Sequence, residues 1–118
     1  MMALDGKRIY LACGKTDMRK GINGLTAIIE TQFKLDPFNE AIFAFCNGNR
    51  DRMKIIEWDG DGFWLHLKRL EHGRFKWPEI DGGEKTMVLN ETELTYLLCG
   101  PGLEQKLKRK QTTKKMAV

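Results

Sequence analysis

The chain has few cysteines and no long apolar run. Its three cysteines, Cys13, Cys46 and Cys99, are odd in number and widely spaced, with no CxxC pair among them. That pattern argues against a disulfide scaffold and against a structural zinc site. No apolar run approaches the roughly 18 residues that a membrane span requires, and the first residues lack the apolar segment of a signal peptide. We therefore predict a cytoplasmic protein.

What the sequence does contain fits one globular domain. It has 118 residues, of which 42% are hydrophobic and 31% charged, values typical of a folded chain with a single core. The net charge of +4 is unevenly distributed, because residues 104–118 hold six Lys or Arg against the single Glu104, a net charge of +5, which leaves −1 for residues 1–103. We predict a single α+β domain over 1–103 and a basic, flexible tail over 104–118.

The first half of the domain reads as strand, helix and hairpin. Residues 8–13 are strand-like, and an apolar stripe predicts an amphipathic helix from Met18, with Thr16 or Asp17 as its cap, ending before Pro37. The stripe consists of Ile22, Leu25, Ile28, Ile29 and Phe33. Residues 41–46 form a short apolar run of the buried-strand type, and the turn 47–51 leads into a strand over 52–58.

The second half reads as a continued antiparallel meander followed by a helix. The "DGDG" at 59–62 is a strong hairpin signal before an alternating strand over 63–68. "RFKW" at 74–77 also alternates and predicts a further strand, and residues 86–89 allow one more. Asn90 with Glu93 approaches a capping box, and Gly100-Pro101 marks the end of that helix. We predict an antiparallel meander sheet packed against two helices.

The alternation along the meander predicts a sheet with two unlike faces. One face would carry apolar side chains to the helices, while the other displays Lys54, Lys68, Arg69, Arg74 and Lys76 with Trp64 and Trp77 among them. Sheets of this kind hold phosphates and stack bases. The alternative is that these cations protect edge strands or pair with Asp51, Glu57 and Glu71.

A second basic cluster lies at the start of the predicted first helix. Lys15, Arg19 and Lys20 stand where free backbone N–H groups already favour negative charge, which makes sense if a phosphate occupies the site. Gly21 and Gly24 would permit close approach of another backbone. The alternative is that Asp17 screens the charge and that the glycines only allow the helix to pack on the sheet.

Motifs for catalysis are incomplete in this sequence. "GKT" at 14–16 resembles the end of a nucleotide-binding Walker loop, but the required earlier glycine is replaced by Ile9. A twelve-residue calcium loop counted from Asp59 would end at Leu70 instead of Glu. His66 and His72 have no partners at metal-ligand spacing. We therefore predict a protein without catalytic residues, cofactor or metal, in which Asp59 and Asp61 are turn residues.

Four segments, taken in order, carry a family resemblance: "YLACGKTDMRKGINGL", "DPF", "NRDRMKIIEWDGDGF" and "KRLEHGRFKWP". Together they resemble the accessory protein called TnpB that insertion sequences of family 66 encode beside their transposase. The likeness covers roughly residues 8 to 100 and implies participation in transposition, without fixing a molecular activity. At "CNGNRD" the sequence departs from the family, whose members tend to carry more arginines before the same aspartate, which weakens the case for a nucleic-acid contact at that turn.

These observations lead to one leading hypothesis and two alternatives. The leading one is a noncatalytic accessory factor of transposition that binds DNA through a basic surface. The residues proposed for that surface are Lys15, Arg19, Lys20, Lys54, Lys68, Arg69, Arg74, Lys76 and Trp77, with tail contacts from Lys106, Lys108, Arg109 and Lys110. An adaptor for the transposase, anchored by exposed Trp64 and Trp77, is the first alternative. An enzyme acting on phosphates is the second, and it would need a buried carboxylate or metal cluster.

Overall fold

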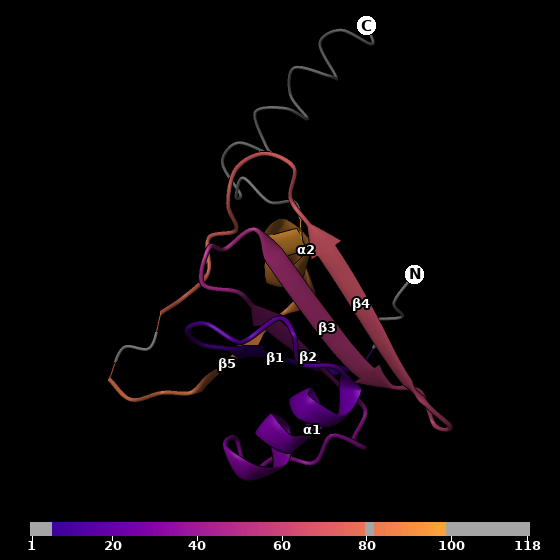
Figure 1. Ribbon diagram of the computed structural model, residues 1–118. Coiled ribbons are helices and arrows are strands. Elements are labelled where there is room, and N and C mark those ends of the chain that lie inside the picture. The colour runs from indigo at the N-terminus through magenta and orange to yellow at the C-terminus, as the bar shows by residue number, and fades with distance from the viewer. Residues whose placement is uncertain (1–5, 80–81, 99–118) are drawn as a thin grey trace, which may run out of the picture.

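The fold is a five-stranded sheet with two helices, as the computed structural model shows for residues 6–79 and 82–98 (Figure 1). In chain order the elements are β1 (Arg8–Ala12), α1 (Ile22–Thr31), β2 (Ala41–Cys46), β3 (Arg52–Trp58), β4 (Phe63–Arg69), β5 (Thr86–Leu89) and α2 (Glu91–Leu98). The predicted α+β class is confirmed. The predicted basic tail, 104–118, lies outside the described residues.

The strand order places the ends of several strands together. The order across the sheet is β4-β3-β2-β1-β5, and every neighbouring pair is antiparallel except β1 with β2, which are parallel. Helix α1 is therefore the crossover between β1 and β2. The carboxyl ends of β1 and β2 meet at the end of the sheet where β3 begins and β4 finishes.

Both faces of the central strands are covered, which the sequence analysis did not predict. Leu25 and Ile29 of α1 pack on one face, and Leu94 of α2 packs on the other. All six residues of β2 are buried, as expected for a strand that is covered on both sides. The prediction of one solvated face that displays a row of cations is therefore wrong for the central strands.

The segment 74–79 is not a strand, although its side chains alternate as predicted. Phe75 and Trp77 insert into the core on the α2 face, while Arg74 and Lys76 are exposed. Trp77 is only 4% exposed, and its indole Nε1 donates a hydrogen bond to the Ala12 carbonyl at 2.7 Å. The prediction that Trp77 is an exposed stacking or anchoring residue is therefore wrong.

Helix α1 begins later than the sequence predicted. Its N-cap is Gly21, without a side-chain cap, and residues 18–19 form a turn before it. Asp17 does not cap the helix because its carboxylate accepts hydrogen bonds from the backbone N and the guanidinium of Arg19. Lys15, Arg19 and Lys20 consequently lie in the loop before the helix, not in its first turn.

Two local predictions are confirmed in detail. At α2, the Asn90 N donates to Glu93 Oε1 at 3.0 Å and the Glu93 N donates to Asn90 Oδ1 at 2.8 Å, which is a reciprocal capping box. In the β3–β4 turn, the Asp59 N donates to the Gly62 carbonyl, and Gly60 has a φ of 107°, which suits glycine.

Of the helices in the described residues, none is long and apolar enough to cross a membrane.

Candidate nucleic-acid interface

Three loops converge at the end of the sheet where β1 and β2 finish. The loop after β1 is joined to β2 by a hydrogen bond from the Thr16 N to the Cys46 carbonyl at 2.7 Å, and to the segment 74–79 by one from the Gly14 N to the Pro78 carbonyl at 2.9 Å. The Phe75 N donates to the Arg50 carbonyl at 2.6 Å, which holds that segment against the β2–β3 turn. Ligands of open sheets commonly bind at the carboxyl ends of parallel strands.

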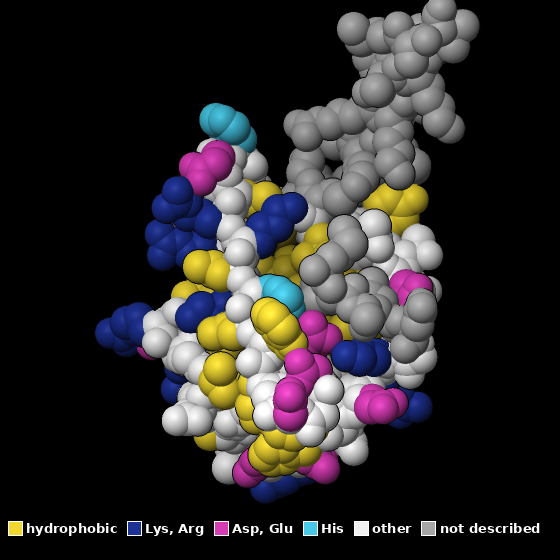
Figure 2. Space-filling model, turned by 90° about the vertical axis from the view of Figure 1, so that its right-hand side faces the viewer, with side chains coloured by type: hydrophobic (Ala, Val, Ile, Leu, Met, Phe, Trp, Pro, Cys, Tyr) yellow, Lys and Arg dark blue, Asp and Glu magenta, His cyan; other side chains and the backbone are white. Residues whose placement is uncertain are grey.

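Cations from all of these loops gather there, and we call this region the basic end. It comprises Lys15, Arg19, Lys20, Arg50, Arg52, Arg69, Arg74 and Lys76. Figure 2 shows Lys and Arg side chains clustered at the upper left, whereas Asp and Glu side chains gather mainly in the lower half beside hydrophobic ones. In this view (Figure 2) Lys and Arg side chains are most concentrated at this end of the strands, and single ones also lie in the lower half.

Part of this charge is already paired. Arg19 pairs with Asp17 at 2.8 Å, Arg69 with Glu71 at 2.9 Å, and Arg50 with Glu79. Five other cations of the basic end take part in none of the ion pairs of the described residues. They are Lys15, Lys20, Arg52, Arg74 and Lys76. All five are exposed. They are the side chains best placed to meet an anion.

Lys15 lies between two hollows of the basic end. It lines a pocket of about 360 Å³, and the other residues that line this pocket are Gly14, Asn47, Gly48, Arg50, Trp77, Pro78 and Glu79. It also lines a second pocket of about 270 Å³. The second pocket is bordered by Thr16, Asp17, Lys20 and Lys85 among others. A cation shared by two adjacent hollows can hold a polyanion that passes across both.

The Asp17–Arg19 pair is a perturbed titrating site at this end. Hydrogen bonds from the Arg19 side chain and backbone lower the pKa of Asp17 to about 2, so the carboxylate stays charged at neutral pH. The pair is exposed, and it neutralises one of the three cations that were predicted to surround the helix start. Its role is to shape the loop before α1, while Lys15 and Lys20 take part in none of the described ion pairs.

Two other predicted DNA-binding residues, Lys54 and Lys68, bond to backbone carbonyls of the protein itself. Lys54 is half-buried, and its Nζ donates to the carbonyls of Met18 at 2.7 Å and Lys20 at 2.9 Å, so it fastens the loop before α1 to the sheet. The Lys68 Nζ donates to the Leu98 carbonyl at the end of α2, where the helix dipole favours a cation. Both ammonium groups therefore stabilise the fold near the basic end, and neither is counted among the cations that can meet a ligand there.

The sequence analysis did not propose Arg52 or Lys85, and it argued against a nucleic-acid contact at the turn that contains Arg50. Arg50 and Arg52 flank the β2–β3 turn, and Lys85 precedes β5 while its carbonyl accepts a hydrogen bond from the Cys13 N at 2.9 Å. The signal that would have placed Arg50 and Arg52 is the parallel pairing of β1 with β2, which brings the loop after β1 beside the β2–β3 turn. Lys85 is placed by the antiparallel pairing of β1 with β5. Alternation within single strands carries no such information.

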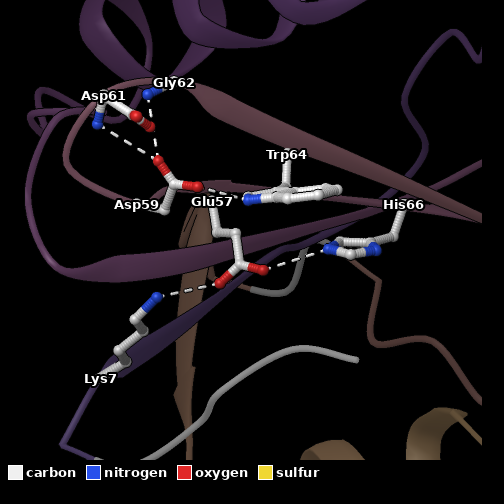
Figure 3. A network of polar contacts seen from close by, with 7 residues as sticks. All are labelled: Lys7, Glu57, Asp59, Asp61, Gly62, Trp64 and His66. Carbon is white, nitrogen blue, oxygen red and sulfur yellow. Dashed lines mark hydrogen bonds and ion pairs between the residues drawn. The ribbon is translucent and has the colours of Figure 1, made fainter.

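The opposite end of the sheet has a different polar network (Figure 3). Glu57 of β3 is only 5% exposed, and its carboxylate accepts a hydrogen bond from Lys7 Nζ at 3.0 Å and contacts His66 Nε2 at 3.1 Å. Trp64 stacks on His66, and its indole Nε1 donates to Asp59 Oδ2 at 2.5 Å. One alternative had suggested that Glu57 pairs with the Lys and Arg residues of the meander, and for Glu57 that suggestion is wrong. Glu57 is instead a buried charge held by two partners.

The described residues also hold histidines, carboxylates and thiols, the kinds of group that can bind a metal ion or act as a nucleophile. Within residues 6–79 and 82–98, no group of three or more His, Cys, Asp or Glu is placed to hold a metal ion. Burial raises the pKa of the Cys46 thiol to about 11, so it is not a thiolate at neutral pH. What the basic end can do chemically is hold anions.

Comparisons with known proteins agree with the resemblance found in the sequence. The profile of the family described as IS66 Orf2 like protein matches residues 7–108. Two relatives from Sinorhizobium fredii (strain NBRC 101917 / NGR234) carry the names uncharacterized protein y4hO and uncharacterized protein y4jC. The first is 38% identical over 93 residues, covering 79% of each chain, and the second is 36% identical over 95 residues, covering 80% of each chain. No solved structure gives a significant match. The chain therefore belongs to the IS66 Orf2-like family, the accessory proteins of an insertion sequence.

Proposed function

We propose that this accessory protein binds DNA through the basic end of its sheet during transposition. The observation that carries the proposal is the strand register, which brings exposed cations from two separate loops and from the start of β3 to one end, without carboxylate partners among the described ion pairs. Phosphates are the anions that such a surface meets on DNA, and their neutralisation by Lys and Arg supplies sequence-independent affinity.

The β3–β4 register adds support. Arg52 lies directly opposite Arg69 in the antiparallel pair. Like charges in that position destabilise a sheet. Glu71 offsets the charge of Arg69, but Arg52 has no partner among the described ion pairs. An anion bound between the two strands would relieve the repulsion, which is the arrangement expected at a phosphate contact.

The protein contributes contacts and position in this proposal, and the chemistry of strand transfer is left to the transposase. The surface would include Lys15, Lys20, Arg52, Arg74 and Lys76, with Arg19, Arg50 and Arg69 beside them in ion pairs that a phosphate can share. Lys54 holds the loop before α1 in place, and Lys68 bonds to the end of α2. Trp77 is buried and does not stack on bases in this proposal.

The test compares charge removal at the two ends of the sheet in the full chain. Lys15→Gln with Arg74→Gln removes two cations from the basic end, and Arg8→Gln with Lys34→Gln removes two from elsewhere on the surface. Affinity for a labelled duplex is measured by fluorescence anisotropy at several salt concentrations. Each lost phosphate contact reduces the slope of log affinity against log salt by about 0.9. The first variant should therefore lose about 2 units of slope and the second none.

The outcomes separate the candidate functions. Equal losses in both variants would mean that charge acts through the whole surface and would refute the basic end as the DNA site. Absence of binding to any duplex, by a folded protein, would favour the adaptor reading. One observation supports that reading independently, because Trp64 is 56% exposed on the edge strand β4, and Trp is frequent among interface anchors.

A further inference from the structure

A cluster of three aromatic rings lies at the end of the sheet opposite the basic end. The Phe38 ring is 5.0 Å from that of Trp58 and 5.3 Å from that of Phe63, measured between centroids, and Trp58 and Phe63 are 4.9 Å apart. Phe38 is 53% exposed, and the other two rings are partly exposed. We call these three residues the aromatic cluster. Phe63 also packs against the buried residues on the α1 face, so the aromatic cluster forms the exposed edge of that core.

Rigid turns hold the rings at the surface. The Asp36 Oδ1 accepts a hydrogen bond from the Phe38 N at 2.9 Å, and Pro37 between them is buried. Trp58 and Phe63 are direct cross-strand partners that flank the β3–β4 turn. Since Ile42 pairs with Glu57, the start of β2 lies beside the end of β3, which brings the two turns together. Rings that are fixed before binding lose little freedom when a partner contacts them.

The two turns that carry the aromatic cluster are rich in carboxylates, and Arg8 lines a pocket beside Asp36 and Glu40. The segments 34–40 and 58–63 hold four carboxylates and one cation, Lys34. The carboxylates belong to Asp36, Glu40, Asp59 and Asp61, and all four residues are exposed. Hydrogen bonding from Asp61 lowers the pKa of Asp59 to about 2, while the nearby Asp59 raises the pKa of Asp61. The two carboxyl groups lie in contact, and a nearby cation would stabilise the negative charge that they carry.

We propose that the aromatic cluster is a docking surface for a lysine- or arginine-rich segment of a partner protein. The faces of aromatic rings attract guanidinium and ammonium groups, and the aliphatic stems of these side chains cover exposed ring surface. The flanking carboxylates receive the charged heads in bidentate or single ion pairs. The same negative charge repels a phosphate backbone, so nucleic acid is not the occupant.

The test uses the three tryptophans as reporters in the isotope-labelled full chain. Trp58 lies in the aromatic cluster, Trp64 stacks on His66, and Trp77 lies beneath the basic end. The probe is a dodecapeptide in which arginine alternates with serine, and its control carries glutamine in place of arginine. We expect the Trp58 indole resonance to shift in a saturable manner with the arginine peptide, with little change at Trp77. An unmoved Trp58 would overturn the proposal.

Variants make the location specific. Phe38→Ala and Asp61→Asn, both at exposed positions, should each weaken the peptide at least fivefold. Leu67→Ala is the matched control, because Leu67 is 60% exposed on the same face of β4 as Phe63 but lies toward the basic end. Equal peptide affinity in all variants, or a loss of affinity with Leu67→Ala as large as with the other two, would also overturn the proposed docking surface. Because the DNA titration reports on the other end of the sheet, failure of one proposal is distinguishable from failure of the other.

Discussion

Replacing Trp77 with phenylalanine separates a structural role of this residue from a role in DNA contact. The change removes the hydrogen bond to the Ala12 carbonyl inside the core, which costs about 1 to 3 kcal/mol when a buried acceptor is left unpaired. The smaller ring also leaves unfilled volume, at about 1 kcal/mol for the lost contacts. We expect the free energy of unfolding to fall by about 2 to 4 kcal/mol, a large share of the 5 to 15 kcal/mol typical of a domain.

The assay is urea unfolding followed by far-ultraviolet circular dichroism, because removing a tryptophan changes the fluorescence baseline. DNA affinity is measured in parallel, at a temperature where both proteins are folded, and should be unchanged. Trp64→Phe is the control, since that side chain is 56% exposed and its loss should cost under about 1 kcal/mol. A Trp77→Phe protein with native stability and severalfold weaker DNA binding would refute the burial argument.

Three further changes test other parts of the structure. Lys54→Met removes both hydrogen bonds to the loop before α1 and should lower the free energy of unfolding by about 1 to 3 kcal/mol, with faster amide hydrogen exchange over 16–21. Glu57→Gln neutralises a buried carboxylate whose partners are partly solvated, and chemical unfolding at pH 7 should show a loss of about 2 to 4 kcal/mol. Arg19→Ala should return the pKa of Asp17 from about 2 toward its ordinary value in a carboxyl titration by nuclear magnetic resonance. Since the folded pKa of Asp17 is below the unfolded one, the contribution of the Asp17–Arg19 pair to stability is present above the unfolded pKa and is lost as pH falls toward 2. An Asp17 pKa that Arg19→Ala leaves unchanged would contradict the assigned cause.

Local signals in the sequence predicted those elements whose cause is local. Asn90 and Glu93 stand three positions apart, and their reciprocal hydrogen bonds involve no other part of the chain. The same holds for the β3–β4 turn, where Asp59 bonds to residues two and three positions later. Such interactions depend on spacing alone, which the sequence displays directly.

Elements that depend on distant contacts were not predictable in the same way. Alternation in 74–77 correctly indicated that Phe75 and Trp77 share one face, but it did not show that this face is buried beneath α2 or that burial there needs no strand ladder. The start of α1 shifted because Asp17 bonds to Arg19, while Lys54, more than thirty positions away, takes the carbonyls of Met18 and Lys20. The basic end itself depends on the parallel register of β1 and β2, which no single segment encodes.

The length of β3 determines how the two ends of the molecule influence each other. Its seven residues, at about 3.3 Å each, separate the basic end from the aromatic cluster by roughly 20 Å. The Debye length at physiological ionic strength is only about 8 Å. Charge brought by a ligand at one end is therefore largely screened at the other, so two partners could occupy the protein together without attracting or repelling each other through it.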